Sequence, residues 1–322
     1  MLSDNPGNRT KLKASVVLQG KTKRICTTFK NYSMLYLFLI PALAYFLIYH
    51  YIPMYGVIIA FKDYSPFMGV IESPWVGWKY FESFFNSIYF WRLIRNTFLL
   101  SFYSLIYGFP IPIIFALLLN ELPFLKYRSL VQTISYIPHF VSTVVIVGMI
   151  SKFLSPTSGF VNSFIELFGG EAINFMSEPS WFRTVYISSG IWQGVGWSSI
   201  IYFAALSAIS PTQYEAAKID GANRWQRIWY ISLPGMLPTI LTMLLLSLGN
   251  IMSVGFEKVY LMYKPVTYET ADIISTYVYR SGILEQNYSF ASAVGLFNSV
   301  INLVLITTFN YLSRRISDYS LW

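Results

Sequence analysis

Three groups of mainly polar residues interrupt long apolar stretches at helical spacing, and their residue types suit the binding of a sugar. They are His139 with Thr143, Gln193 and Gly194 with Trp197, and Ser247 with Asn250 and Val254. Residues three or four positions apart share one face of a helix. Hydroxyl and amide groups match sugar hydroxyls, and a flat indole suits the C–H face of a sugar ring. Hydrogen bonding between neighbouring helices explains the same residues equally well, so both explanations stay open.

His139 alone among these residues has the chemistry of a metal ligand or a pH switch. A metal site needs further ligands, and one imidazole without a second ligand is weak evidence for such a site. The single cysteine, Cys26, supplies neither an internal disulfide nor a thiolate cage. We therefore expect polar packing for His139 and no cofactor or metal site in this chain.

The segment 210–234 has a different chemistry, because charged residues concentrate in it. It predicts a short helix, a break and a second helix: Ser210 suits the N-cap, Pro211 the first helical position, and Gly221 the left-handed end. The side chains of Glu215, Lys218 and Asp220 can make ionic contacts. Between them, Ala216 and Ala217 add little bulk, so the groove of another protein can approach the helix closely. The segment is typical of a docking element.

The elements that must position these residues are membrane helices. Of 322 residues, 55% are hydrophobic and 12% charged, whereas about 25% are charged in a typical globular domain. Six stretches lack Asp, Glu, Lys and Arg, and each is long enough for the roughly 20 residues that cross a bilayer. These stretches are 35–59, 97–119, 130–151, 185–209, 228–254 and 291–312. We expect a retained first span, with no cleaved signal peptide.

The charges between these stretches predict the orientation. One side carries 14 Lys and Arg against 5 Asp and Glu, a net charge of +9, and the other carries 9 against 10, a net charge of −1. The positive side faces the cytoplasm, which places both termini and the 210–234 segment inside. This bias, with attraction of the basic residues 1–33 to anionic lipid, accounts for the net charge of +8 without nucleic-acid binding. The outer segments 61–96, 152–184 and 255–290 are longer than the inner ones, which favours docking of a partner there.

Identities at fixed spacing in the segment 210–234 match a known pattern. The spacing Glu215-Ala216-Ala217, three residues, Gly221, nine residues, Ile231, one residue and Leu233-Pro234 resembles, without a departure, the signature of permeases in bacterial binding-protein-dependent ABC importers. Similarity to the carbohydrate branch extends over nearly the whole chain after residue 33. It includes Trp75-Val76-Gly77-Trp78, Tyr136-Ile137-Pro138-His139-Phe140, Gly159-Phe160-Val161-Asn162 and Ser180-Trp181. The chain looks like the LplB-type polysaccharide and oligosaccharide permeases, a group that includes the first permease subunit of alginate importers.

The resemblance implies a fold, partners and roles. The fold is an all-α integral membrane protein of six transmembrane helices, a type I permease with a MetI-like core (34–322) and a cytoplasmic coupling helix in the loop 210–234. The partners are a second permease, two copies of an ATP-binding subunit that holds ATP and Mg, an external solute-binding protein and a carbohydrate. The implied ATPase-coupling residues are Glu215, Ala216, Ala217, Lys218, Asp220 and Gly221. The implied substrate path contains Gln193, Gly194, Trp197 and Ser247, then Asn250, His139 and Thr143.

The chain itself is not expected to hydrolyse ATP. Gly20-Lys21-Thr22 matches the end of a phosphate-binding loop, but Ser15 stands where the first glycine belongs. An ion-coupled carrier or channel is the second interpretation and a membrane enzyme the third. The spans lack the acids that mark ion pathways, and no cluster at catalytic spacing gathers at either membrane face.

The sequence leaves the charge of the solute open. A uronate polymer would call for cations along its path, and the spans offer none beyond His139 in its charged form. Such charge is expected from the partner permease or from Arg92, Arg95 and Arg183 at the outer interface.

Overall fold

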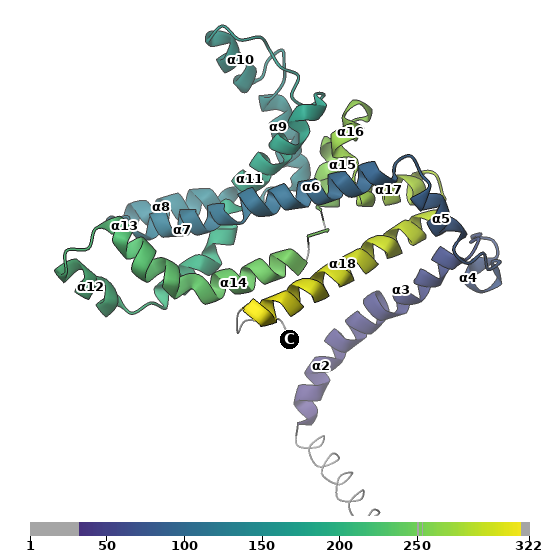
Figure 1. The fold of residues 1–322 in the computed structure, drawn as a ribbon, viewed down its shortest axis with the longest axis horizontal. Coiled ribbons are helices and arrows are strands. Elements are labelled where there is room, and N and C mark those ends of the chain that lie inside the picture. The colour runs from purple at the N-terminus through teal and green to yellow at the C-terminus, as the bar shows by residue number, and fades with distance from the viewer. Residues whose placement is uncertain (1–31, 250, 253, 317–322) are drawn as a thin grey trace, which may run out of the picture. The chain divides into compact units, whose positions relative to one another are not determined.

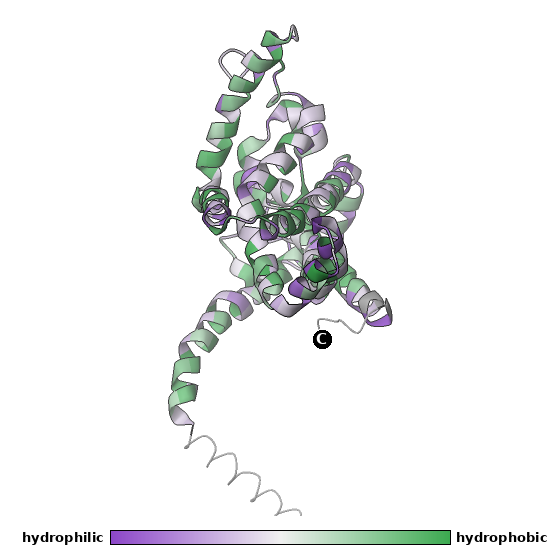
Figure 2. Ribbon diagram, turned by 90° about the vertical axis from the view of Figure 1, so that its left-hand side faces the viewer, coloured by the Kyte–Doolittle hydropathy of each residue, from purple (hydrophilic) through white to green (hydrophobic). Residues whose placement is uncertain are grey.

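The computed structural model describes residues 32–249, 251–252 and 254–316, and the chain divides into two compact units, Met1–Ile58 and Ile59–Trp322. The described part of the first unit is helical, with α2 (Ser33–Phe46), a π-helical turn (Leu47–Tyr51) and α3 (Ile52–Met54) before the turn Tyr55–Phe61. Its large apolar side chains are exposed, and Figure 2 shows hydrophobic residues along it. An exposed helix that is apolar all round suits a lipid environment. The basic residues 1–31 lie outside the described residues.

The described residues of the second unit are mostly helical, and an isolated antiparallel bridge joins Lys62 to Trp75. Its helices are α4 (Gly69–Glu72), α5 (Lys79–Phe85), α6 (Phe90–Gly108), α7 (Pro110–Asn120), α8 (Leu125–Tyr136), α9 (Thr143–Phe153), α10 (Phe160–Leu167), α11 (Pro179–Ser207), α12 (Pro211–Ile219), α13 (Arg224–Arg227), α14 (Leu233–Gly249), α15 (Phe256–Met262), α16 (Tyr268–Ala271), α17 (Ile274–Tyr279) and α18 (Tyr288–Ile316). Figure 1 shows α6 and α7 end to end, and α14 packs against α18.

The helix α11 is the centre of the second unit. It packs against α6, α7, α8 and α14, and α14 packs against α18. Apolar side chains fill the contacts: one core surrounds Phe203 and Met236, and a second surrounds Phe84 and Val294. In a bilayer such contacts are stabilised by van der Waals packing between the helices, because lipid tails are as apolar as these side chains. These cores hold the helices that carry the candidate site.

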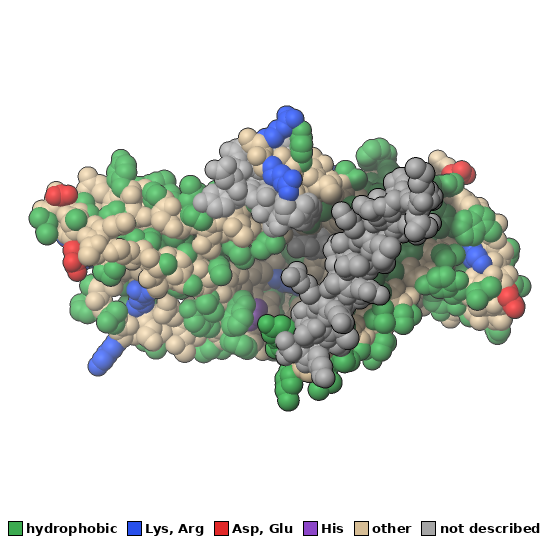
Figure 3. Space-filling model, turned by 90° about the horizontal axis from the view of Figure 1, so that it is seen from below, with side chains coloured by type: hydrophobic (Ala, Val, Ile, Leu, Met, Phe, Trp, Pro, Cys, Tyr) green, Lys and Arg blue, Asp and Glu red, His purple; other side chains and the backbone are tan. Residues whose placement is uncertain are grey.

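The predicted spans correspond to helices. Four described helical stretches are long and apolar enough to cross a membrane: Ser33–Phe61, Phe90–Asn120, Arg224–Gly249 and Tyr288–Tyr311. Two bent pairs, Leu125–Phe140 with Thr143–Phe153 and Pro179–Ser207 with Pro211–Ile219, bring the number to six if each pair is one span. In Figure 3, hydrophobic side chains cover much of the face in view, as suits a protein that lies in lipid.

The third span differs from the expectation of one continuous helix. A 3₁₀ turn, Ile137–Phe140, follows α8, and the axes of the helical stretches before and after residues 141–142 differ by 103°. Val141 is extended, and the Ser142 hydroxyl caps α9 by accepting from the Val145 amide at 3.5 Å. A new helix therefore starts at Thr143. The prediction that His139 and Thr143 share one helical face is wrong, because the break lies between them.

Candidate functional site

The helix α12 ends in a fixed turn. Gly221 has φ +78°, a left-handed conformation that residues with a Cβ rarely adopt. The amide of Gly221 donates to the Lys218 carbonyl at 3.1 Å, and the amide of Ala222 donates to the Ala217 carbonyl at 2.8 Å. This pair of bonds is a Schellman motif, which satisfies the last carbonyls of a helix. The predicted stop at Asp220-Gly221 is confirmed.

The helix that follows begins directly after this turn. Asn223 and Gln226 form a capping box: the Asn223 side chain accepts from the Gln226 amide at 2.9 Å, and the Asn223 amide donates to the Gln226 side chain at 2.7 Å. Only Ala222 separates the glycine of one motif from the cap of the next. The corner between α12 and α13 is therefore held on both sides by hydrogen bonds, which suits a part that moves as one body.

The helix α12 begins at the predicted residue, but the predicted N-cap side chain does not form a capping hydrogen bond. Ser210 is the N-cap residue and Pro211 the first helical residue, as predicted. The Ser210 hydroxyl caps no amide; its hydrogen-bond partner is the Thr212 hydroxyl at 2.8 Å. The axis of α12 lies at 73° to that of α11, so α12 runs across the end of the helices rather than along them (Figure 1).

One side of α12 is anchored and the other is open. The Tyr214 hydroxyl is 2.9 Å from the Ser232 hydroxyl, which joins α12 to the π-helical turn Ile228–Ser232 before α14. Glu215, Ala216, Lys218 and Asp220 are exposed, and Ala217 is half-buried. Ile219 is 87% exposed. This side of α12 is therefore accessible to another protein.

An ion pair ties this corner to the bundle. The Arg227 guanidinium donates to the Glu121 carboxylate at 2.5 Å, and the two side chains are 13% and 11% exposed. Glu121 follows α7, so the pair links α13 to the loop between α7 and α8. Because both charges are largely removed from water, loss of one partner leaves an unpaired buried charge, which is costly.

Two cavities lie between α11 and the helices α6 and α7. The larger has a volume of about 770 Å³ and is lined by α6, α7, α11 and α14, and the smaller, of about 290 Å³, by α6, α7, α11 and α15. Both share the same wall, made of Ser104, Gly108, Pro112, Tyr186 and Ser198. The hydroxyls of this wall, which the sequence patterns did not single out, are hydrogen-bonding groups suited to a sugar.

The structure brings four of the predicted path residues to these cavities. Trp197 and Ser247 line the larger one, together with Val254. Gln193 and Gly194 line the smaller one. The Ser247 hydroxyl donates back to the Met243 carbonyl at 2.8 Å. Asn250 lies outside the described residues.

His139 and Thr143 line neither cavity. The His139 ring stacks on the Trp197 indole, with centroids 4.5 Å apart and planes at 3°. The Gln193 amide donates to the Val141 carbonyl at 3.3 Å, inside the broken third span. Both contacts tie the break to α11, so a packing role accounts for His139 directly.

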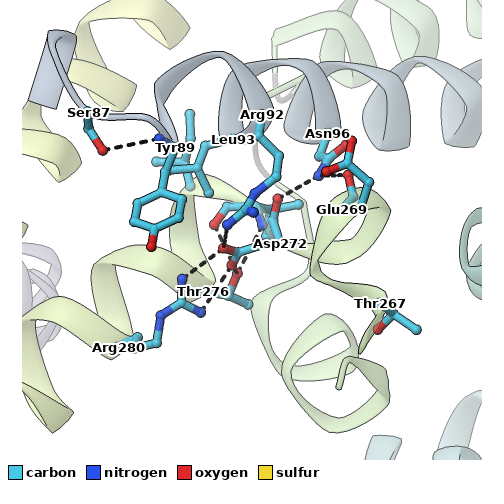
Figure 4. Close-up of polar contacts among 12 residues, drawn as sticks. Ser87, Tyr89, Arg92, Leu93, Asn96, Thr267, Glu269, Asp272, Thr276 and Arg280 are labelled. Carbon is cyan, nitrogen blue, oxygen red and sulfur yellow. Dashed lines mark hydrogen bonds and ion pairs between the residues drawn. The ribbon is translucent and has the colours of Figure 1, made fainter. Parts of the chain in front are cut away.

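The outer arginines that were expected to supply charge to the path are engaged elsewhere. Asp272, with 0% of its side chain exposed, pairs with Arg92 at 3.3 Å and with Arg280 at 2.8 Å. Arg95 pairs with Glu269 at 2.6 Å. The Asn96 amide donates to the backbone carbonyls of Glu269 and Asp272, at 3.0 and 3.1 Å (Figure 4). Arg183 donates to Asn96 at 2.9 Å. The cluster fixes the start of α6 against α16 and α17.

A cation that sequence reasoning missed lines the smaller cavity. Lys258 belongs to α15, in the outer segment 255–290, yet it lies beside Gly190, Gln193 and Gly194 of α11. Its ammonium group donates to the Tyr186 carbonyl at 3.1 Å. Burial lowers the pKa of Lys258 to about 8. No sequence pattern marks this lysine, because its position depends on how α15 folds back against α11.

Comparison with known proteins identifies the family. Residues 108–318 match the family of binding-protein-dependent transport system inner membrane components. The chain belongs to this family. The permease is 44% identical over 309 residues to Protein LplB of Bacillus subtilis (strain 168), with 96% of this chain and 97% of that protein covered. It is 40% identical over 309 residues to the polygalacturonan/rhamnogalacturonan transport system permease protein YteP of the same organism, with 96% of both chains covered.

A solved structure has the same fold. The permease superposes with a TM-score of 0.85 and 45% sequence identity on a chain in the crystal structure of the bacterial alginate ABC transporter in complex with alginate pentasaccharide-bound periplasmic protein. The alignment covers 92% of the permease and 100% of that chain. The MetI-like membrane fold predicted from the sequence is thereby confirmed, and the permease is an inner-membrane subunit without an ATPase of its own.

Proposed function

We propose that this permease carries an oligosaccharide or polysaccharide, delivered by an extracytoplasmic solute-binding protein, through the inner membrane by alternating access. It works with a second permease and with two ATP-binding subunits, which hold the ATP and Mg. Similarity over nearly the full length to carbohydrate permeases carries the proposal. The cavities beside α11, with an indole and several hydroxyls in their walls, are consistent with a sugar path.

The relatives favour an acidic saccharide. One is a permease for polygalacturonan/rhamnogalacturonan, and another belongs to an alginate transporter. Both names describe polymers that contain uronic acids. We therefore assign Gln193, Gly194, Trp197 and Ser247 to the substrate path, with His139 and Thr143 as supports on either side of the break. Asn250 follows α14 and belongs to the same assignment.

The helix α12 is proposed as the coupling helix. Glu215, Ala216, Ala217, Lys218 and Asp220 contact a groove of the ATP-binding subunit, and Gly221 with the Asn223 cap transmits the motion to α13 and α14. The exposure of these residues and the two hydrogen-bonded motifs at the corner support this role. Closure of the nucleotide-binding dimer then draws the inner ends of the two permeases together.

The orientation follows from the charge distribution. With α12 on the cytoplasmic side, both termini lie in the cytoplasm, residues 1–33 form a basic cytoplasmic tail and residues 34–322 form the membrane domain. The surplus of Lys and Arg on that side supports the assignment.

Transport by the complete importer tests the proposal. The permease, its partner permease, the ATP-binding subunit and the binding protein are reconstituted in liposomes, and uptake of alginate pentasaccharide and of tetragalacturonate is measured. We expect uptake that requires ATP and the binding protein. Uptake that depends on an ion gradient and not on ATP would favour the ion-coupled alternative.

A further inference from the structure

Lys258 places a cation inside the region proposed as the sugar path. It lines the smaller cavity with Gln193 and Gly194, on the side formed by α15. Gly190 lies next to it: a Cβ at that glycine would be 3.4 Å from the Lys258 ammonium nitrogen. Gly190 is five residues beyond Val185, where the predicted apolar stretch of α11 begins, or about 7.5 Å along the helix. The ammonium group therefore reaches past the outer boundary of the span.

The ammonium group has capacity for another partner. An ammonium has three N–H donors, and one of them is used by the Tyr186 carbonyl at 3.1 Å. The nitrogen also lies 5.0 Å from the centroid of the Tyr186 ring. Among the residues that the structure describes, no carboxylate forms an ion pair with Lys258, whereas Arg92, Arg95 and Arg280 of the outer cluster all have one.

An unpaired cation in a partly buried position is unfavourable unless something compensates it. Burial is the cause that lowers the pKa of Lys258 to about 8, which still leaves the group mostly protonated at pH 7. An anionic ligand that enters the cavity restores the electrostatic stabilisation that water would have given. The same cavity offers the Gln193 amide and the hydroxyls of Ser104 and Ser198, which match the hydroxyl groups of a sugar.

We propose that Lys258 binds the carboxylate of a uronic acid unit as an acidic saccharide passes along α11. This inference rests on the proposed function and names the residue that recognises the acidic group of its substrate. Gly190 leaves space for the ammonium group, and the neighbouring amide and hydroxyl groups take the hydroxyls of the same sugar unit. The path then contains the cation that an acidic polymer requires and that the apolar spans lack.

Lysine variants of the reconstituted importer test the proposal. The complete complex, with its binding protein, is made with Lys258→Gln, Lys258→Met and Lys258→Arg, and co-purification of all subunits establishes assembly. Because Lys258 has no ion-pair partner among the described residues, replacing it with a neutral side chain leaves no acidic group there unpaired. Uptake of alginate pentasaccharide and of tetragalacturonate is measured for each complex. Lys264→Gln is the matched control, since Lys264 lies in the same outer segment and donates to Ser177 at 3.2 Å, away from the cavities.

The expected pattern is specific to charge. Lys258→Gln and Lys258→Met reduce uptake of the acidic probes about tenfold or more, as loss of a hydrogen bond to a charged group would. Lys258→Arg keeps most of the uptake, and so does the Lys264 control. Wild-type uptake rates in the Gln and Met variants would overturn the inference, and so would an equal loss in the Gln, Met and Arg variants, which indicates a structural role.

Two outcomes with the wild-type complex separate the two proposals. Uptake of a neutral oligosaccharide such as maltotetraose, without uptake of either acidic probe, would overturn the inference and leave the importer function intact. Uptake of none of the saccharides, by a complex that assembles and hydrolyses ATP, would contradict the proposed function itself.

Discussion

Arg227 and Glu121 form an ion pair with a donor–acceptor distance of 2.5 Å between α13 and the residue that follows α7. Both side chains are largely buried, and Arg227 also donates to the Ala222 carbonyl at 3.4 Å. The corner after α12 is thus attached to the bundle at a defined point. In the proposed coupling role of α12, this pair would transmit a displacement of the helix to α7, and the chain itself would transmit it to α14.

Replacing either member of this pair should weaken coupling. We expect Glu121→Gln and Arg227→Met each to reduce the ATPase stimulation that the loaded binding protein produces. The double variant should lose less than the sum of the single losses, with an interaction energy of ~1–3 kcal/mol between the two positions. The double-mutant cycle is measured as stimulated ATPase rates of the complete importer. Strictly additive losses would show that the pair transmits nothing.

A side chain at Gly221 should weaken the coupling of ATP hydrolysis to uptake. At φ +78° an alanine costs about 1–2 kcal/mol, and a proline, whose φ is fixed near about −65°, also loses the amide that donates to Lys218. We expect the complex with Gly221→Pro to assemble but its ATP-driven uptake to fall at least about tenfold. A tenfold loss corresponds to an increase of ~1.4 kcal/mol in the activation free energy. The uptake of Gly221→Ala should be intermediate.

Gly169→Ala is the matched control for this site. Gly169 has φ +83° in the outer segment, and a Cβ there meets nothing within 4 Å, as at Gly221. Its local strain is the same, but it lies far along the chain from α12, so uptake should be retained. Equal loss in both alanine variants would attribute the effect to general destabilisation.

Trp197 should matter for uptake because it lines the larger cavity. We expect Trp197→Ala to reduce saccharide uptake by up to about tenfold, since packing of a ring on an aromatic face contributes about 0.5–1.5 kcal/mol. Trp192→Ala is the control: Trp192 is on the same helix and 47% exposed, against 46% for Trp197, but it lines a different, mainly apolar cavity with Met149 and Phe153. Similar uptake by the two variants would favour packing as the role of Trp197.

The uptake of an acidic saccharide should depend on pH through Lys258. Burial lowers the pKa of this lysine to about 8, so the group is charged below pH 8 and loses its proton as the pH rises through that value. Its attraction for a carboxylate is present on the acid side and lost on the alkaline side. We expect uptake of tetragalacturonate to fall between about pH 7 and pH 9. Arginine stays protonated in this range, so a fall of the same size in Lys258→Arg would contradict the assignment.

Much of the fold was predictable because apolar length and charge placement are local properties of the sequence. The turn at Gly221 was also predictable from local sequence, because a glycine that follows a helical segment commonly adopts the left-handed conformation that ends the helix. The break after Phe140 was missed, because the apolar stretch 130–151 has the composition of a continuous span. Pro138 lies in the 3₁₀ turn before the break, and this proline was the feature of the sequence that could have indicated an interrupted helix.

Lys258 shows what sequence spacing cannot supply. The lysine follows the fifth apolar stretch and counts as an outer charge, but α15 packs against α9, α11 and α17 and brings it to the cavity wall. The opposite holds for the outer arginines. The sequence suggested Arg92 and Arg95 as cations for the solute path, but in the fold they form ion pairs with Asp272 and Glu269. Tertiary contacts decide which cations face the path.

Cross-linking from α12 tests whether this helix is the one that docks on the ATP-binding subunit. In a Cys26→Ser background, which removes the single native cysteine, Ala216→Cys is labelled with a maleimide benzophenone in the assembled importer and irradiated. Ala172→Cys, an exposed alanine of the outer segment, is the control. We expect an adduct between this chain and the ATP-binding subunit from position 216 and none from position 172. An importer that takes up saccharide yet gives no such adduct from position 216 would contradict the assignment of α12 as the coupling helix.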